Sequence, residues 1–271
     1  MSPAASAIPS VLVFAGLDPT GGAGLQADIE AVASMGCHAA PVATALTVQD
    51  TRDVTASYAV DTATLIEQAR TVLRDLPIAA CKIGLVGNAE LVEAIHSILM
   101  DYPKLPVVLD PVLASGAGSP LVDEDVQHAM ISLLFPITTV LTPNSLEART
   151  LAPEADSLEA SGQALLARGC ELVLITGTPE PGPRVVNTLY GNLRRLETFE
   201  WERLPGSYHG SGCTLASAIA GLLAQGDEPF TAIRQAQEYT WEALKHAYRV
   251  GQGQLIPNRL FWARSARASR T

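Results

Sequence analysis

"VLVFAGLDPTGGAGLQADIEA" (residues 11–31) joins a short apolar run to a segment of helical period through a turn with three glycines. A buried strand, a turn and a helix in this order form the repeating unit of parallel sheets. The stretch therefore predicts a strand at residues 11–16, a helix at about 24–36 and an α/β fold built on a parallel sheet.

The same alternation continues along most of the chain. Short runs rich in β-branched residues predict strands at residues 40–46, 79–84, 106–110, 139–142 and 171–176. Segments of helical period predict helices at about 61–75, 88–101, 121–135, 144–152, 157–168, 212–225 and 229–249. Residues 184–203 differ, because two runs around "YGN" indicate a hairpin. No repeat or linker divides the chain, so we predict a single domain over residues 1–271, with tails at 1–10 and 263–271.

The composition excludes several classes of protein. A net charge of −10 argues against a nucleic-acid or anionic-membrane binder, since those proteins need a basic surface. No apolar run is long enough to span a bilayer, and the first ten residues do not resemble a signal peptide. Four widely spaced cysteines predict neither a disulfide framework nor a structural zinc. We expect a soluble cytoplasmic protein with small-molecule partners.

Glycine-rich and polar stretches follow the predicted strands. They are "GLDPTGGAG", "TVQD", "KIG", "LDPV" and "LTPNSLE", at the ends of the first five strands. Ligands of α/β sheets bind outside the carboxyl ends of the strands. The sequence therefore predicts a binding site at this edge. The first glycine-rich turn matches neither the Walker motif nor the dinucleotide fingerprint, which disfavours a nicotinamide-dependent enzyme.

"GSGCTLASA" (residues 210–218) places backbone N–H groups at the start of a predicted helix, where anions bind. An ordinary glycine turn into a buried helix is an equally good interpretation. Cys213 at this position has two interpretations as well. Its thiol pKa could be lowered, so that it serves as a base for a substrate hydroxyl, or it could fill space beside an anion hole.

Three acidic or amide residues are candidates for a metal site. Asn144 and Glu147 lie three residues apart at a predicted helix start, which also fits a capping box. Asp110 closes an apolar strand before a proline. Together they supply oxygen ligands of the kind that Mg²⁺ prefers. Asp28, one turn into its helix, either stabilises the helix dipole or accepts hydrogen bonds from a polar substrate.

Taken in order, these stretches resemble the ribokinase-like superfamily, and more narrowly the hydroxymethylpyrimidine/phosphomethylpyrimidine kinases of thiamine biosynthesis. The resemblance covers about residues 11 to 250 and is carried by "AGLDPTGGAGLQADIEA", "ALTVQDT", "KIGLVG", "VLDPVL", "LTPNSLEA" and "GSYHGSGCTLASAIA". It implies a three-layer α/β/α sandwich and a homodimer. It also implies transfer of phosphate from ATP, with Mg²⁺, to 4-amino-5-hydroxymethyl-2-methylpyrimidine and then to its monophosphate.

The resemblance also implies roles for individual residues. Those implied to bind the pyrimidine are Asp28 and Gln49, by hydrogen bonds, and Gly16, Leu85 and Val112, as lining. Those implied to act on the phosphates are the anion-hole residues Gly210, Ser211, Gly212 and Cys213, the metal-region residues Asp110 and Glu147, and the nucleotide-region residues Asn144 and Thr176. A side-chain amide donates and accepts at once, as an aminopyrimidine edge requires of Gln49, although an exposed turn residue is the alternative there.

Two departures from the family pattern keep other functions open. Thr176 stands where many pyrimidine kinases have lysine, which puts the second phosphorylation in doubt. Cys213 stands where most sugar kinases of the superfamily have aspartate, a better base at neutral pH. His209, next to the anion hole, either contacts phosphate or only packs. The alternatives are a pyridoxal or pyridoxine kinase and a non-catalytic pyrimidine-binding relative.

Overall fold

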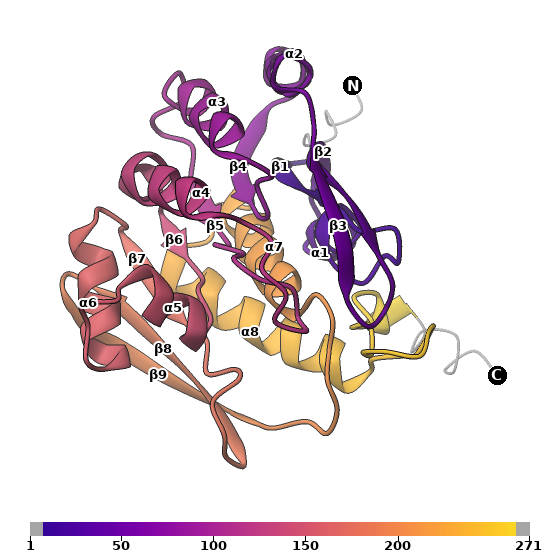
Figure 1. The fold of residues 1–271 in the computed structure, drawn as a ribbon, viewed down its shortest axis with the longest axis vertical. Coiled ribbons are helices and arrows are strands. Elements are labelled where there is room, and N and C mark those ends of the chain that lie inside the picture. Colours follow the sequence, from indigo (N-terminus) through magenta and orange to yellow (C-terminus); the bar gives the residue numbers. More distant parts are fainter. Residues whose placement is uncertain (1–7, 264–271) are drawn as a thin grey trace, which may run out of the picture.

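The computed structural model describes residues 8–263, whose strands form one nine-stranded sheet in the order β3-β2-β1-β4-β5-β6-β7-β8-β9 (Figure 1). Its parallel strands are β1 (Ser10–Leu17), β2 (His38–Gln49), β4 (Ile78–Ile83), β5 (Val107–Leu109), β6 (Val140–Leu141) and β7 (Leu172–Ile175). Antiparallel strands complete the two edges, with β3 (Val54–Ala59) on one side and β8 (Arg184–Gly191) and β9 (Arg194–Glu202) on the other.

Helices cover both faces of this sheet (Figure 1). One face packs against α2 (Thr62–Asp75), α3 (Ala89–Leu99), α4 (Glu124–Ala129), α5 (Ser145–Leu151) and α6 (Leu158–Ala167). A π turn and a 3₁₀ turn at residues 130–137 extend α4. The other face packs against α1 (Gly24–Ser34), α7 (Ser211–Ala224) and α8 (Pro229–Lys245). The predicted α/β/α sandwich is confirmed.

The predicted elements appear within a few residues of their expected bounds, with two differences. Residues 54–59 form β3, which the sequence analysis missed, because this edge strand is mostly exposed and lacks a buried apolar run. Ser10 is buried and begins β1, although it falls inside the predicted N-terminal tail. Residues 8, 9 and 263 of the two predicted tails are also described, whereas residues 1–7 and 264–271 lie outside the described residues.

The strand order determines where ligands are expected. The chain goes from β1 to β2 on one side and returns to β4 on the other side of β1. Ligand sites of α/β sheets lie at such a reversal, outside the carboxyl ends of the strands. The segment after α8 returns to this edge, since Gln254 N–H donates to Thr51 O in the β2–β3 turn at 2.8 Å. Figure 1 shows this C-terminal segment, in yellow, against the tip of the β2–β3 ribbon.

Candidate active site

The first turn of α7 presents backbone donors that are free to bind a ligand. Gly210 caps the helix in the left-handed conformation, with φ of +83°, and no side chain caps the helix. Within residues 8–263, the amide N–H groups of Gly210, Ser211, Gly212 and Cys213 have no hydrogen-bond acceptor. Free N–H groups at a helix N-terminus attract anions. The expected anion hole is therefore available, and its occupation by phosphate stays a prediction.

The two glycine-rich turns pack directly against each other. A Cβ on Gly210 would lie 2.0 Å from Gly22 O, and a Cβ on Gly24 would lie 2.2 Å from Gly16 O. Both Gly210 and Gly24 also have positive φ angles. No larger residue fits either position, because backbone atoms of the first turn and of the end of β1 occupy the space that a side chain would need.

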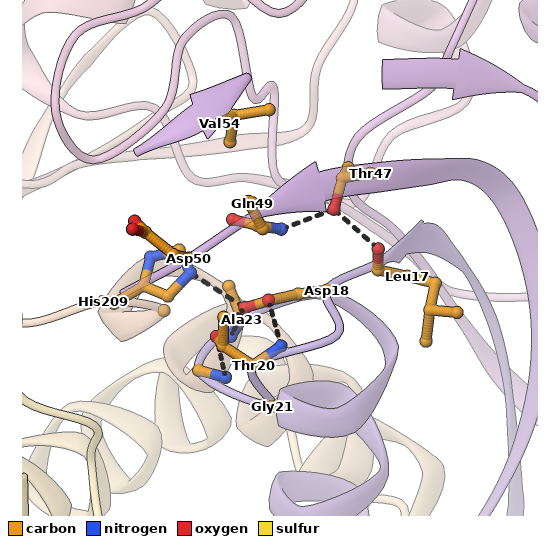
Figure 2. Close-up of polar contacts among 12 residues, drawn as sticks. Leu17, Asp18, Thr20, Gly21, Ala23, Thr47, Gln49, Asp50, Val54 and His209 are labelled. Atoms are coloured by element: carbon orange, nitrogen blue, oxygen red, sulfur yellow. Dashed lines mark hydrogen bonds and ion pairs between the residues drawn. The ribbon is translucent and has the colours of Figure 1, made fainter. Parts of the chain in front are cut away.

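The turn at residues 18–23 uses its own amides internally. The Asp18 carboxylate accepts hydrogen bonds from Thr20 N and Ala23 N, both at 2.8 Å, and lies 2.8 Å from His209 Nε2 (Figure 2). Burial alone would raise the pKa of Asp18, but hydrogen bonds from His209, Thr20 and Ala23 lower it. This turn is a support for the site and offers few donors to a ligand. The sequence analysis did not identify Asp18, and His209 contacts Asp18 in this structure.

A buried ion pair lies beneath the α7 turn. Lys82 Nζ, on β4, is 2.9 Å from Asp28 Oδ1, and both side chains are fully buried. Ser217 of α7 donates a hydrogen bond of 2.6 Å to the same oxygen. This differs from the expectation that Asp28 contacts substrate, because the carboxylate faces the Lys82 ammonium inside the protein. Burial alone would lower the pKa of Lys82, but Asp28 and its acidic neighbours raise it.

Sequence analysis missed Lys82, although a lone lysine in the apolar run "AACKIG" is an unusual residue for a strand that is buried on both faces. Gly84 is tied to it, because a Cβ there would lie 2.5 Å from Lys82 Nζ. The glycine therefore makes room for the ammonium group.

Cys213 is half-buried and lies next to Asp110, toward which its thiol donates a hydrogen bond. Burial raises the pKa of the Cys213 thiol to about 12, against the opposing effect of Lys82. The hypothesis of a lowered thiol pKa is therefore wrong, because the acidic neighbours and the desolvation outweigh the nearby cation. Burial also raises the pKa of Asp110 to about 6, although Lys82 opposes this shift.

Asn144 and Glu147 form the capping box that their spacing suggested. Asn144 Oδ1 accepts from Glu147 N at 2.9 Å, and Glu147 Oε2 accepts from Asn144 N at 2.8 Å. Burial, and then the neighbouring Asp110, raise the pKa of Glu147 to about 8. The two carboxylates share a buried region and repel each other, and a further cation would stabilise their ionised forms.

At this site, Asp110 and Glu147 are the two acidic side chains that could bind Mg²⁺. Among residues 8–263, no group of three or more His, Cys, Asp or Glu side chains is placed to hold a metal. Asp110 Oδ2 is buried without a hydrogen-bond partner in the same part of the chain, whereas both oxygens of Glu147 accept backbone N–H groups. Mg²⁺ in phosphoryl-transfer sites is held by one or two carboxylates plus substrate phosphates, so the acids present fit it.

The remaining predicted residues lie at the same edge. Gly16 and Leu85 are neighbours, since a Cβ on Gly16 would lie 3.1 Å from Leu85 Cδ2. Val112 is joined to Asp110 by a 2.8 Å backbone hydrogen bond. Thr176 follows β7 and forms a bridge with Asn144. These pairs lie at the ends of neighbouring strands, while their membership of one pocket and their contacts with ligands stay predictions.

Arg259 is a functional candidate that the sequence analysis did not find. It is 1% exposed, and its Nε donates to Thr214 Oγ1 of α7 at 2.9 Å. Its guanidinium also donates to Gly22 O and lies 3.2 Å from the Glu30 carboxylate. A buried arginine thus connects both glycine turns from behind the free amides. No local motif marks this residue, because its partners come from distant parts of the chain.

Comparison with known proteins finds relatives that match most of the chain. The family model described as phosphomethylpyrimidine kinase matches residues 18–258. A hydroxymethylpyrimidine/phosphomethylpyrimidine kinase of Synechococcus elongatus is 35% identical over 253 residues, covering 92% of this chain and 96% of that protein. The thiamine biosynthesis bifunctional protein ThiED of Geobacter sulfurreducens is 34% identical over 95% of this chain, which spans only 54% of its length. The ADP complex of Bacillus subtilis pyridoxal kinase superposes with a TM-score of 0.87 at 26% identity, covering 95% and 99% of the two chains.

Proposed function

The chain belongs to the phosphomethylpyrimidine kinase family, and we propose that it transfers the γ-phosphate of ATP to 4-amino-5-hydroxymethyl-2-methylpyrimidine and then to the monophosphate. The observation that carries the proposal is the row of unpaired amides at the start of α7, directly above Asp110. The bifunctional relative is a thiamine biosynthesis protein, and this likeness supports a role of the proposed reaction in that pathway.

The residues of this site position the reactants and neutralise charge. The hydroxymethyl oxygen attacks the γ-phosphorus in line, the bond to the β–γ bridging oxygen breaks to release ADP, and the hydroxyl proton passes to the transferred phosphate. The amides of residues 210–213 stabilise the negative charge that develops on the phosphate. Phosphoryl transfer depends on positioning and electrostatic stabilisation more than on covalent chemistry, so these donors are sufficient for the main effect. Cys213 stays a thiol at neutral pH and lies beside the substrate hydroxyl group that reacts.

Asp110, which has an unpaired buried oxygen, and Glu147 would hold Mg²⁺. When bound, the ion neutralises charge on the triphosphate. Asn144 and Thr176 lie where the nucleotide phosphates are expected. Thr176 brings no charge to them. The buried guanidinium of Arg259, behind the amides, is a cation that can offset part of that loss.

Phosphorus NMR of the products from hydroxymethylpyrimidine and MgATP tests the proposal. We expect signals from a monophosphate and then a pyrophosphate ester. Formation of the monophosphate alone would limit the activity to the first step. Tight pyrimidine binding by calorimetry without any release of ADP would show a non-catalytic binder and overturn the proposal.

A second candidate function is phosphorylation of pyridoxal, which the close superposition on a pyridoxal kinase favours. The curated kinase relative is more similar in sequence, at 35% against 26% identity, which favours the pyrimidine. Comparing kcat/KM for the two substrates with MgATP distinguishes them.

The proposed partner other than substrates is a second copy of the chain. Leu46, Val48 and Tyr58 lie on one face of the β2–β3 ribbon and are 48%, 52% and 63% exposed. An apolar face of this kind is typical of a surface that is covered in an oligomer. Sedimentation of the wild type and of Val48→Lys tests for the dimer.

The four free cysteines agree with a reducing compartment such as the cytoplasm. Among residues 8–263, no helix has the length and apolar character needed to cross a membrane.

A further inference from the structure

The Thr47 hydroxyl connects the ends of two strands beside the candidate pocket. Its Oγ1 donates a hydrogen bond of 2.8 Å to Leu17 O, at the end of β1. The same oxygen accepts a hydrogen bond of 2.7 Å from Gln49 Nε2. Figure 2 shows the three groups in a row, with Leu17 and Gln49 on either side of Thr47. The Gln49 amide is therefore held by a neighbour of its own strand and, through it, by β1.

This row determines which way the Gln49 amide faces. A hydroxyl has one proton, and a carbonyl oxygen can only accept, so the proton of Thr47 is committed to Leu17 O. The Thr47 oxygen can then only accept from Gln49, and the amide atom next to it must be the nitrogen. A rotation of the amide by 180° would bring Gln49 Oε1 against Thr47 Oγ1 with no proton between them. The geometry itself thus excludes the flipped amide.

We propose that Thr47 is a positioning residue that fixes the polarity of the Gln49 amide and thereby selects a ring with an amine next to a ring nitrogen. The inference rests on the proposed function, in which Gln49 meets the aminopyrimidine edge. With Nε2 held by Thr47, Oε1 accepts from the 4-amino group and the second N–H of Nε2 donates to the ring nitrogen.

A 4-oxo analogue presents the opposite order on the same edge, with an acceptor at position 4 and a donor at the ring nitrogen. The ring cannot turn over to compensate, because the 5-hydroxymethyl group must face the phosphate. A freely rotating glutamine would accept either ring, whereas the fixed amide rejects the oxo ring by leaving polar groups unpaired.

The experiment measures kcat/KM with MgATP for 4-amino-5-hydroxymethyl-2-methylpyrimidine and for its 4-oxo analogue. The proteins are the wild type, Thr47→Val, Thr47→Ser and Thr55→Val. Thr55 is a matched control, because its hydroxyl donates to Val48 O on the same ribbon at 2.9 Å. We expect the amino/oxo ratio to fall about tenfold or more in Thr47→Val. We expect Thr47→Ser, which keeps the hydroxyl, and Thr55→Val to retain the wild-type ratio.

The result separates this inference from the proposed function. Wild-type turnover of the aminopyrimidine with an unchanged ratio in Thr47→Val would overturn the role of Thr47 and leave the function intact. If the wild type turns over neither pyrimidine, calorimetry of the same two ligands gives the ratio from binding constants. In that case a loss of selectivity in Thr47→Val still supports the positioning role, and no binding of either pyrimidine overturns both proposals. A melting temperature for each variant excludes loss of folding as the cause.

Discussion

The Cys213 thiol lies between the first turn of α7 and the Asp110 carboxylate, and burial raises its pKa to about 12. Since the thiolate is the reactive form, we expect iodoacetamide to alkylate Cys213 at pH 8 about a thousandfold more slowly than a free thiol. Mass spectrometry of the labelled peptide measures this rate. The other three cysteines are buried and burial raises their pKa values as well, so a small free thiol serves as the reference.

Substitution of the same residue tests its part in catalysis. A general base contributes roughly 10²- to 10⁴-fold to a rate. Because Cys213 stays protonated, we expect Cys213→Ala to lower kcat by less than about tenfold. A loss beyond a hundredfold, with KM for the pyrimidine unchanged, would instead show that the thiol takes the proton of the hydroxymethyl group.

Lys82 and Asp28 form an ion pair with no exposed surface. Removing one partner of such a pair leaves an uncompensated charge and costs about 3–5 kcal/mol of unfolding free energy. We expect this loss in Lys82→Met, measured by urea unfolding, and a large recovery in the double variant Asp28→Leu/Lys82→Met. The exposed Lys245–Glu242 pair is the control, since Lys245→Met should change stability by less than about 1 kcal/mol. Equal effects at both pairs would contradict the structural importance of the buried one.

Asp28 also shows what a local pattern leaves out. Its position in the first helix could be predicted from sequence, and so could the choice between a dipole role and a ligand role. The third possibility, an internal ion pair, needs Lys82 on a strand 54 positions later and Ser217 on α7. Such a partner is defined only once β4 and α7 are packed on the same side of α1.

At the scale of single elements, α5 begins with a capping box whose Glu147 carboxyl group is an unusually weak acid. The pKa of Glu147 is raised to about 8 by burial and then by Asp110, and burial raises the pKa of Asp110 to about 6. A raised folded-state pKa stabilises the protonated protein, so this contribution is complete below about pH 4 and is lost as the pH rises through 6 and 8. We therefore expect the melting temperature without Mg²⁺ to fall between pH 5 and pH 8.5.

Two comparisons test this explanation by differential scanning fluorimetry. Glu147→Gln should flatten the fall, since the side chain no longer ionises. MgADP should raise the melting temperature more at pH 8.5 than at pH 5.5, because both carboxylates must be ionised to hold a cation. A profile of the same slope in Glu147→Gln would contradict the assigned cause.

Helices and strands could be predicted from the sequence where the period of their apolar residues agrees with their burial. The helices and the parallel strands follow from their spacing, as for β1 and α1. The edge strand β3 does not, because "VTASYA" is exposed on most of its length and its pairing with β2 supplies the order. The hairpin was expected around "YGN", and the structure places its turn at Asn192 and Leu193, both with positive φ. A leucine at such a position gives no turn signal in the sequence.

Across the whole molecule, Arg259 joins the segment after α8 to both glycine turns. Arg259→Ala leaves Thr214, Gly22 O and Glu30 without their donor, so we expect a loss of about 3 kcal/mol in stability. We also expect KM for MgATP to rise at least about tenfold, because the free amides lose their alignment and a nearby cation. Arg259→Lys should have a stability and a KM for MgATP between those of the wild type and of Arg259→Ala, since an ammonium group cannot reproduce the forked donors of the guanidinium.

The matched control is Arg249→Ala in the same segment, where the guanidinium donates to Gly253 O on the surface. Steady-state kinetics and thermal unfolding of the three variants provide the comparison. If Arg259→Ala loses stability but keeps its KM for MgATP at 15 °C, the residue only supports the fold.

The same long connections explain which part of the site stayed beyond sequence reasoning. Motifs located the amides, Asp110 and the capping box, because each is a local pattern. Asp18 and His209 are 191 residues apart, and Arg259 is 237 residues from Gly22. Each pair meets only when the two ends of the chain close the same edge of the sheet.

The position of Arg259 has a consequence for how the protein is made. During synthesis Gly22, in the first glycine turn, is made 237 residues before Arg259, which binds it. Nascent chains that have released all the described strands still lack the Arg259 hydrogen bonds between the two turns, so we expect weak phosphate binding until residue 259 has been added. We therefore expect the growing polypeptide to reach its full affinity for MgATP only after residue 259 has been added.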